Sequence, residues 1–207
     1  MNRAPSITLY GTPPSGHAHR VEVLLKLLGL PYSYVTATVD VRQTPEFLAL
    51  NPLGQIPVLQ DDEAVVCDST AILIYLIEKY APDSPWLPRD PKTRAEVQRW
   101  LSIASAEVRF GPATARAVSQ WNMAGNLDSA KAIAARLFNF MEGHLAGRLF
   151  LAAPHPTLAD LACYAYIAHA PEGGIDLSPY PHIQAWLGRV AAIPGFTDMA
   201  PLPLPAQ

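Results

Sequence analysis

The sequence predicts a chain of two parts, an α/β domain over residues 1–80 followed by an all-helical bundle domain over residues 91–207. In the first part, short β-branched or aromatic runs alternate with segments of helical periodicity, in the order β-α-β-α-β-β-α. The stretch APDSPWLPRDP then places four prolines in residues 81–91, a density that breaks helix and strand and predicts a linker over 81–90. Beyond the linker only the helical period persists, which predicts a bundle.

The elements of the α/β domain follow from short runs and their boundary residues. Apolar residues recur at helical spacing from Gly16 to Leu28, before Gly29, a residue typical of helix C-terminal caps. Thr44 followed by Pro45 predicts another helix start. The other expected elements are strands at 6–10 and 32–39, a helix at 44–52, a hairpin of strands 56–60 and 64–68, and an apolar helix at 69–80.

The second domain reads as four helical segments. They are expected at about residues 91–120, 127–146, 157–170 and 179–193. Pro112 lies inside the first, and because proline lacks an N–H and crowds the preceding turn, we expect it to kink or interrupt that helix. The proline-rich end APLPLPAQ is expected to be loosely held.

Composition limits the classes of function. Half of the 207 residues are hydrophobic, 16% are charged, and the net charge is −3 without a basic run, which argues against nucleic acid as the main partner. No apolar stretch reaches the roughly 20 residues of a membrane span, and the N-terminus lacks a long apolar signal region. Cys67 and Cys163 fit buried free thiols in a reducing compartment better than a disulfide. We therefore expect a cytoplasmic protein whose partners are neither membranes nor nucleic acids.

The stretch TLYGTPPSGHAHRV joins the first strand to the first helix and places Ser15 at the helix start. A serine there ordinarily caps the helix, and its hydroxyl can also donate to an anion at the positive helix end. His17 and His19 are two residues apart and do not share a helix face, and no acidic or cysteine neighbour completes a metal site. The stretch also lacks the Gly-x-Ser-x-Gly elbow of serine hydrolases. It predicts no bound metal.

The tetrapeptide Gln55-Ile56-Pro57-Val58 opens the first strand of the hairpin. Proline cannot donate a ladder hydrogen bond, so its place here admits two interpretations. One is an ordinary trans proline at a strand start. The other is a cis Ile56–Pro57 bond that exposes the backbone of Ile56, which would then pair with an extended peptide.

Asp68 and Ser69 stand where the hairpin feeds the next helix. Ser69 is expected to cap this helix with its hydroxyl. The first N–H groups of the helix and the Ser69 hydroxyl would in addition receive a carboxylate, and Asp68 would receive an ammonium group. One helix start therefore offers a site for both charges of an α-amino acid, its carboxylate and its ammonium group.

A second helix start carries the pair Thr157-x-x-Asp160. The spacing is that of a capping box, with Asp in the place of Glu. Asp160 is therefore expected to be structural rather than a catalytic acid.

These stretches together resemble the glutathione transferase superfamily over nearly the whole chain. The strongest match is TPEFLALNPLGQIPVLQDDEAVVCDSTAILIYL, which is similar to the PEFL-x-x-NP-x-G-x-VP-x-L…(E/D)S-x-AI-x-x-YL signature of its N-terminal domain. LYGTPPSGHAHRV resembles the serine-type start of phi- and theta-like members, and the pattern at Thr157 and Asp160 resembles the folding box of the helical domain. The resemblance implies a thioredoxin-like domain followed by an all-α domain.

The resemblance also implies that glutathione is bound as a co-substrate. Ser15 takes the position of the serine whose hydroxyl stabilises the glutathione thiolate. Tyr10 is its rival, because it resembles the catalytic tyrosine of alpha-, mu- and pi-like members. Ile56, before Pro57, takes the position whose backbone pairs with the cysteinyl part.

The remaining positions implied by the resemblance hold the two ends of glutathione. Asp68 and Ser69 match the residues that bind the γ-glutamyl end. Gln55 matches a position that contacts the peptide or its glycine carboxylate. Arg42 and Gln43 fall where phi-like members often have His-Lys, a difference that leaves open which of the two holds the glycine end.

The implied activity is conjugation of glutathione to small apolar electrophiles by a homodimer. The electrophile pocket is expected between the domains, at Glu107, Arg109, Phe110 and Tyr164. A non-enzymatic, glutathione-binding or regulatory role is an alternative. A thiol-oxidoreductase would need a cysteine where this chain has Ser15, and an isomerase of the maleylacetoacetate type would need a Ser-Ser-Cys motif that is missing.

Overall fold

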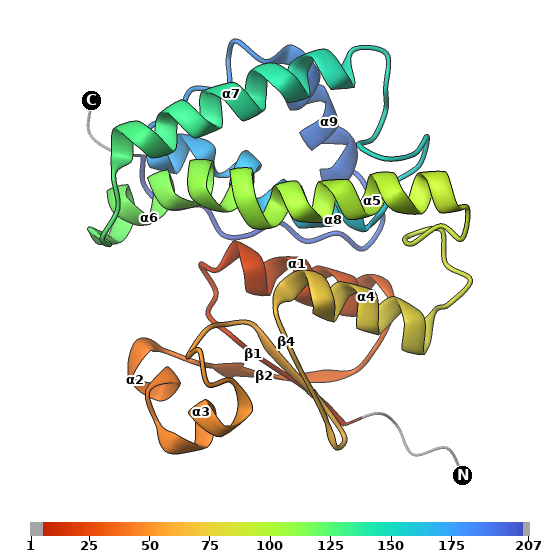
Figure 1. The fold of residues 1–207 in the computed structure, drawn as a ribbon, viewed down its shortest axis with the longest axis vertical. Coiled ribbons are helices and arrows are strands. Elements are labelled where there is room, and N and C mark those ends of the chain that lie inside the picture. The colour runs from red at the N-terminus through yellow and green to blue at the C-terminus, as the bar shows by residue number, and fades with distance from the viewer. Residues whose placement is uncertain (1–5, 205–207) are drawn as a thin grey trace. The chain divides into compact units, whose positions relative to one another are not determined.

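The structure, a computed structural model, describes residues 6–204 and contains two compact units (Figure 1). The sheet unit comprises the chain as far as Ser84 together with Pro194–Met199. The helical unit comprises Pro85–Ile193 and the chain from Ala200. The predicted fold class, a thioredoxin-like domain followed by an all-helical domain, is confirmed. Between residues 6 and 204, no helix is long and apolar enough to cross a membrane.

The sheet unit is built on a four-stranded mixed sheet with the strand order β2-β1-β3-β4. Strand β1 pairs in parallel with β2 and antiparallel with β3, and β3 pairs antiparallel with β4. The elements are β1 (Ile7–Gly11), α1 (Gly16–Leu27), β2 (Tyr32–Thr36), α2 (Val39–Arg42), α3 (Pro45–Leu50), β3 (Val58–Asp61), β4 (Ala64–Cys67) and α4 (Ser69–Tyr80).

Helices cover both faces of this sheet. Successive side chains of β1 point to opposite faces, so two neighbouring residues of this strand show which helix lies on which face. Gly11 faces α1, and a Cβ at Gly11 would lie only 2.6 Å from the Cβ of Ala18. Tyr10 therefore points to the other face, where its ring meets Phe47 of α3 at a centroid distance of 6.0 Å. Helix α1, which α4 adjoins, thus lies on one face and α3 on the other.

The chain differs from the predicted pattern between β2 and α3. The strand expected over residues 32–39 ends at Thr36, and α2 forms at Val39–Arg42. Thr38 begins this helix, because its hydroxyl accepts a hydrogen bond from the Val41 N–H at 3.5 Å. So short a helix carries no apolar period that a sequence pattern could reveal.

The helical unit contains α5 (Pro91–Ile103), η1 (Ala104–Ala113), α6 (Thr114–Trp121), α7 (Leu127–Leu145), α8 (Leu158–Ala168), η2 (Ala170–Gly173) and α9 (Pro181–Ala191). The segment predicted as one helix over about 91–120 is α5, η1 and α6 in direct succession. Pro112 lies inside η1, which is π-helical. The proline thus coincides with a change of hydrogen-bond pattern, and the helix continues through it.

Asp160 connects α8 to two other parts of the helical unit. One carboxylate oxygen accepts from the Thr157 N–H at 2.8 Å, which completes the predicted capping box. The other accepts from the Leu151 N–H at 3.0 Å and from Trp186 Nε1 at 2.9 Å. Burial raises the pKa of Asp160, and these hydrogen bonds oppose the rise. The structural role predicted for Asp160 is confirmed.

A buried ion cluster holds part of the C-terminal chain in the helical unit. Glu172 accepts hydrogen bonds from Arg116, from His169 Nδ1 at 2.6 Å and from the Leu202 N–H at 2.8 Å. The Pro203 carbonyl accepts a further hydrogen bond from α6 at 2.9 Å. The expectation of a loosely held end is therefore wrong for these two tail residues, and the last three residues lie outside the described chain.

The segment Pro194–Met199 packs on α1 in the sheet unit. His19 Nε2 donates to the Thr197 carbonyl at 2.7 Å, and the His19 ring meets Phe196 at a centroid distance of 6.0 Å. Lys26 Nζ donates to Thr197 Oγ1 at 3.2 Å. His19 thus packs against this C-terminal segment, and its partner lies 178 residues away.

Candidate functional site

Four chain segments meet at one edge of the sheet. Gly11 pairs with Thr36, Tyr10 with Val58, and Val58 with Cys67, so the ends of β1, β2 and β4 adjoin the start of β3. The segments that continue from this edge carry most of the site residues predicted from the sequence, namely Ser15, Arg42, Gln43, Gln55, Ile56, Pro57, Asp68 and Ser69.

Ser15 is the N-cap of α1. Its Oγ accepts a hydrogen bond from the Ala18 N–H at 3.2 Å, and the residue is half-buried. Among residues 6–204, no acceptor takes the Ser15 hydroxyl proton. An anion at this helix start would therefore meet a free O–H donor and the positive end of the helix dipole.

Tyr10 lies on the face of the sheet opposite α1. Its hydroxyl donates to Gln60 Oε1 at 3.3 Å, and its ring packs against the cluster of Ala37, Phe47 and Val58. The Tyr10 hydroxyl thus has a protein acceptor, whereas the Ser15 hydroxyl has none within the described chain.

The loop before β3 presents the backbone of Ile56. The Ile56–Pro57 bond is cis, so the first interpretation of this stretch, an ordinary trans proline, is wrong. The N–H and the carbonyl of Ile56 form no hydrogen bond with other described residues. Gln55 has an exposed side chain, and its carbonyl accepts from Asn51 Nδ2 at 2.9 Å, which ties the loop together.

Asp68, one residue before the predicted position, is the N-cap of α4. Its Oδ1 accepts from the Thr70 N–H at 2.8 Å and from the Ala71 N–H at 3.1 Å. The prediction that Ser69 caps this helix is wrong, because the carboxylate of Asp68 reaches the same N–H groups. Oδ2 of the exposed Asp68 accepts nothing from the described residues and remains available to a cation.

Ser69 lies against a cation that sequence reasoning missed. Arg20 of α1 is 1% exposed and donates from Nη1 to Ser69 Oγ at 3.3 Å. His17 Nδ1 lies 3.5 Å from the same oxygen. Ser69 is itself 4% exposed, and its N–H binds no other described residue. The available signal was a charged residue three and four positions before Val23 and Leu24, on the apolar side of the helix.

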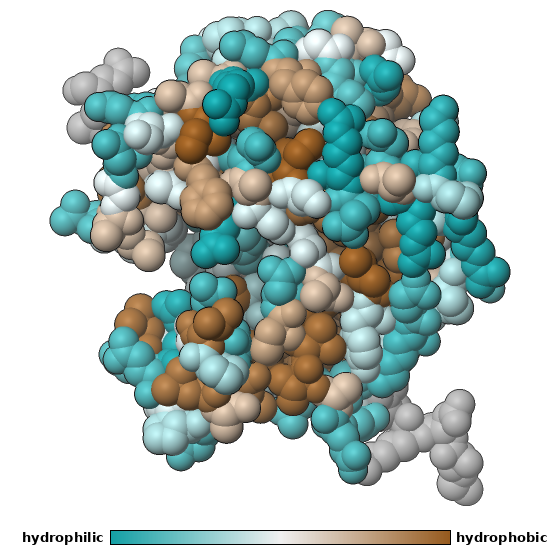
Figure 2. All heavy atoms as spheres, viewed as in Figure 1, coloured by the Kyte–Doolittle hydropathy of each residue, from teal (hydrophilic) through white to brown (hydrophobic). Residues whose placement is uncertain are grey.

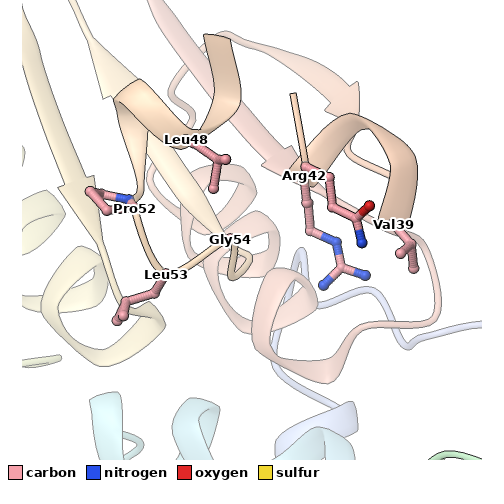
Figure 3. Close-up of a pocket in the computed structure, with 7 residues that line it drawn as sticks. Val39, Arg42, Leu48, Pro52, Leu53 and Gly54 are labelled. Carbon is pink, nitrogen blue, oxygen red and sulfur yellow. The ribbon is translucent and has the colours of Figure 1, made fainter. Parts of the chain in front are cut away.

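Helices α2 and α3 and the loop after them surround a hollow of about 350 Å³ (Figure 3). It is lined by Val39, Arg42, Gln43, Leu48, Pro52, Leu53 and Gly54. Figure 3 shows Arg42 on one side, with Leu48, Pro52 and Leu53 on the other. Arg42 Nε donates to the Thr38 carbonyl at 3.3 Å. The two terminal nitrogens of Arg42 form no hydrogen bond within the described chain. The hollow thus combines apolar walls with one guanidinium.

The four residues expected at an electrophile pocket have different surroundings in the helical unit. Phe110 is 54% exposed, and the Arg109 guanidinium lies 5.4 Å from its ring centroid. Glu107 is half-buried on the same segment, η1. Tyr164 is 3% exposed, and its ring meets Trp186 at a centroid distance of 6.3 Å.

Both cysteines are free thiols. Cys67 Sγ donates to the Leu50 carbonyl at 3.4 Å, and burial raises the pKa of this thiol. Cys67 is only half-buried, so the prediction of a buried thiol is wrong for it. Cys163 is buried and donates to the Trp100 carbonyl at 3.8 Å.

Comparison with known proteins gives matches over both units. Family models described as the N-terminal and C-terminal domains of glutathione S-transferase match residues 9–85 and 118–194. Glutathione S-transferase 3 of Zea mays is 34% identical over 216 aligned residues, which cover 96% of each chain. A glutathione S-transferase structure from Pseudomonas fluorescens superposes with a TM-score of 0.87 at 33% identity, covering 93% of this chain and 98% of its own. A glutathione transferase homologue from Drosophila mojavensis, solved with bound glutathione, gives 0.81 at 26% identity, covering 92% and 89%.

Proposed function

Because the chain belongs to the glutathione S-transferase family and is a glutathione transferase, we propose that Ser15 stabilises the thiolate of bound glutathione. The sulfur of glutathione is the nucleophile, and it attacks a small apolar electrophile. Ser15 acts as a hydrogen-bond donor and is neither nucleophile nor base. The observation that carries this assignment is the Ser15 hydroxyl at the start of α1, whose oxygen accepts from Ala18 and whose proton is free.

The energy required is within reach of one such donor. A free alkyl thiol has a pKa near 8.5, so only a few per cent is ionised at neutral pH. A hydrogen bond to a charged group contributes about 1.5–3 kcal/mol, which corresponds to roughly one to two pKa units. The end of α1 adds about 0.3–1 kcal/mol in favour of an anion.

The rival assignment to Tyr10 has less support. Tyr10 and Gly11 point to opposite faces of the sheet, and Gly11 is the one that faces α1. The Tyr10 hydroxyl already donates to Gln60. Stabilising a sulfur at the start of α1 would require this side chain to leave its contact with Phe47.

The neighbouring groups suit the rest of the tripeptide. The free N–H and carbonyl of Ile56, beside Pro57, would pair with the cysteinyl part as an added strand does. Ser69 offers an N–H and a hydroxyl to the γ-glutamyl carboxylate, and Asp68 Oδ2 offers a negative charge to its ammonium group.

The glycine carboxylate is assigned to the hollow lined by Arg42 and Gly54. Arg42 provides two free terminal nitrogens there, the geometry that binds a carboxylate through two hydrogen bonds. Gln43 lines the same hollow and adds a neutral donor. The exposed Gln55 side chain is close along the chain and is proposed to contact the peptide.

For the electrophile, the exposed surface of η1 supports the assignment of Glu107, Arg109 and Phe110. The burial of Tyr164 against Trp186 favours a core role for that residue. We place the protein in the cytoplasm as a homodimer. Its free thiols agree with a reducing compartment.

The thiolate assignment is tested by following the ultraviolet absorbance of the glutathione thiolate against pH in complexes of the wild type, Ser15→Ala and Tyr10→Phe. We expect Ser15→Ala to raise the apparent thiol pKa by about one to two units. Turnover at neutral pH should then fall about three- to thirtyfold, towards the few per cent of thiolate that a free thiol has, while glutathione still binds.

Tyr10→Phe is the matched control, since it also removes one hydroxyl near the edge of the sheet, and its titration should stay that of the wild type. A titration that moves only in Tyr10→Phe would make Ser15 a helix cap and nothing more. If neither variant shifts it, backbone amides alone hold the sulfur. A wild type that fails to bind immobilised glutathione would contradict the whole assignment.

A further inference from the structure

Arg20 is buried behind the residue assigned to the γ-glutamyl end of glutathione. We propose that Arg20 is a positioning residue, which orients the Ser69 hydroxyl so that its proton points at the γ-glutamyl carboxylate. This inference rests on the proposed function of Ser69, and it adds a residue that has no need to touch the ligand.

The hydrogen bond between Arg20 and Ser69 can run in only one direction. A guanidinium has donors only, so in the 3.3 Å contact Arg20 Nη1 must donate and Ser69 Oγ must accept. The hydroxyl proton of Ser69 is then left for another acceptor. His17 Nδ1 accepts this proton only in the tautomer protonated at Nε2, and it lies 3.5 Å away, the outer limit of a hydrogen bond, so a carboxylate at normal distance would replace it.

Ser69 presents two hydrogen-bond donors to a ligand. Its backbone N–H, at the first position of α4, binds no other described residue. With the oxygen held by Arg20, the N–H and the O–H of one residue are both available to one carboxylate. A hydrogen bond received from a cation also polarises a hydroxyl and makes it a stronger donor.

Two charged side chains, Asp68 and Arg20, act on the ligand at Ser69. Asp68 adjoins Ser69 and repels an incoming carboxylate, although it attracts the ammonium group of the same ligand. Arg20 is 1% exposed, so its charge acts through a medium of lower dielectric than water. The buried cation thus offsets the repulsion on the carboxylate side.

The experiment is a double-mutant cycle of Arg20→Met and Ser69→Ala, read by calorimetric binding of S-methylglutathione, which has no thiol and is independent of Ser15. Each single variant should weaken binding by about ten- to a hundredfold. If Arg20 acts through Ser69, the double variant should bind within about twofold of the weaker single variant. Lys26→Met, which removes a cation at the other end of α1, should bind as the wild type does.

A second probe separates positioning from a purely structural role. The analogue of S-methylglutathione in which the γ-glutamyl carboxylate is replaced by hydrogen should bind the wild type and Arg20→Met equally. If Arg20 only joins α1 to α4, its loss will weaken both probes alike, or will add to the loss from Ser69→Ala. Either result overturns the inference, as does unchanged binding by a folded Arg20→Met.

If Arg20→Met does not fold, the same cycle is run with Arg20→Lys, which keeps the charge and loses the fork of donors. The inference then predicts the same non-additive loss of binding in the double variant and the same difference between the two probes. A wild type that binds neither probe contradicts the proposed function itself. A wild type that binds S-methylglutathione without coupling between Arg20 and Ser69 contradicts this inference alone.

Discussion

Gly11 determines how closely α1 approaches the sheet, and with it the position of Ser15. An alanine Cβ at this residue would lie 2.6 Å from the Ala18 Cβ and 2.7 Å from the Tyr34 hydroxyl. Tyr34 can rotate away, but Ala18 belongs to the helix and can move only with it. We therefore expect Gly11→Ala to lower the free energy of unfolding by about 1–3 kcal/mol, measured by urea denaturation.

Gly188 provides the control, because it lies inside α9 and a Cβ there would meet nothing within 4 Å. Gly188→Ala should stabilise the protein by about 0.5–1 kcal/mol through helix propensity. Equal stability of Gly11→Ala and the wild type would show that α1 is free to move outward.

The two cysteines have environments that oppose thiol chemistry. Cys67 donates its proton to the Leu50 carbonyl, and burial raises its pKa, so little thiolate forms at neutral pH. Cys163 is buried in the helical unit. We expect Cys67→Ala and Cys163→Ala to conjugate glutathione within about threefold of the wild-type rate. Loss of activity in a folded Cys67→Ala would favour a thiol-oxidoreductase instead.

At the scale of elements, Asp61 joins the end of β3 to the last turns of α4. Its Oδ2 accepts from Tyr75 at 2.9 Å, Lys79 at 2.7 Å and Tyr80 at 2.6 Å. Burial on its own raises the pKa of Asp61, but the hydrogen bonds from Lys79, Tyr80 and Tyr75 outweigh it and hold the pKa below the usual range. The carboxylate therefore contributes to stability in its ionised form.

The prediction from this cluster is a loss of stability in acid. Because the folded-state pKa of Asp61 is lowered, its contribution is present above the unfolded value near 3.9 and is lost as the pH falls through the folded value. Asp61→Asn should cost about 1–3 kcal/mol of unfolding free energy at pH 7, and the difference from the wild type should shrink below about pH 4.

Asp62, exposed in the same turn, is the matched control, and Asp62→Asn should stay within about 0.5 kcal/mol at every pH. If the difference in unfolding free energy between Asp61→Asn and the wild type persists unchanged in acid, the ionised carboxylate of Asp61 is not the source of the lost stability.

At the scale of the whole molecule, the sheet unit exposes apolar side chains near the hollow. Leu53 is 76% exposed, Val39 57% and Leu48 37%. Figure 2 shows apolar residues gathered over the part of the molecule where Figure 1 places α2 and α3. A self-associating protein would remove such a surface from water.

Light scattering at micromolar concentration should therefore give about twice the 22.5 kDa of one chain, since we place the protein as a homodimer. The mass should stay constant on tenfold dilution. A mass of one chain across that range would rule out the homodimer at these concentrations and leave the proposal for Ser15 intact.

The amino-acid sequence by itself determined what depends on neighbouring residues. Ser15 before an apolar helical run, Thr157 three residues before Asp160, and the prolines of 81–91 are local signals, and the elements that they begin or separate are present in the structure. Caps and breakers act within one turn of chain, so their chemistry is legible without knowing the fold.

Tertiary structure alone decided the contacts between distant residues. Arg20 and Ser69 are 49 positions apart, and Glu172 and Leu202 are 30 apart. Only the course of the chain brings such pairs within hydrogen-bond distance, and burial then increases the contribution of each contact to stability. Asp68 replaced Ser69 as the cap of α4 for a related reason, since both residues suit the role and the path of the chain leaving β4 decided which of them took it.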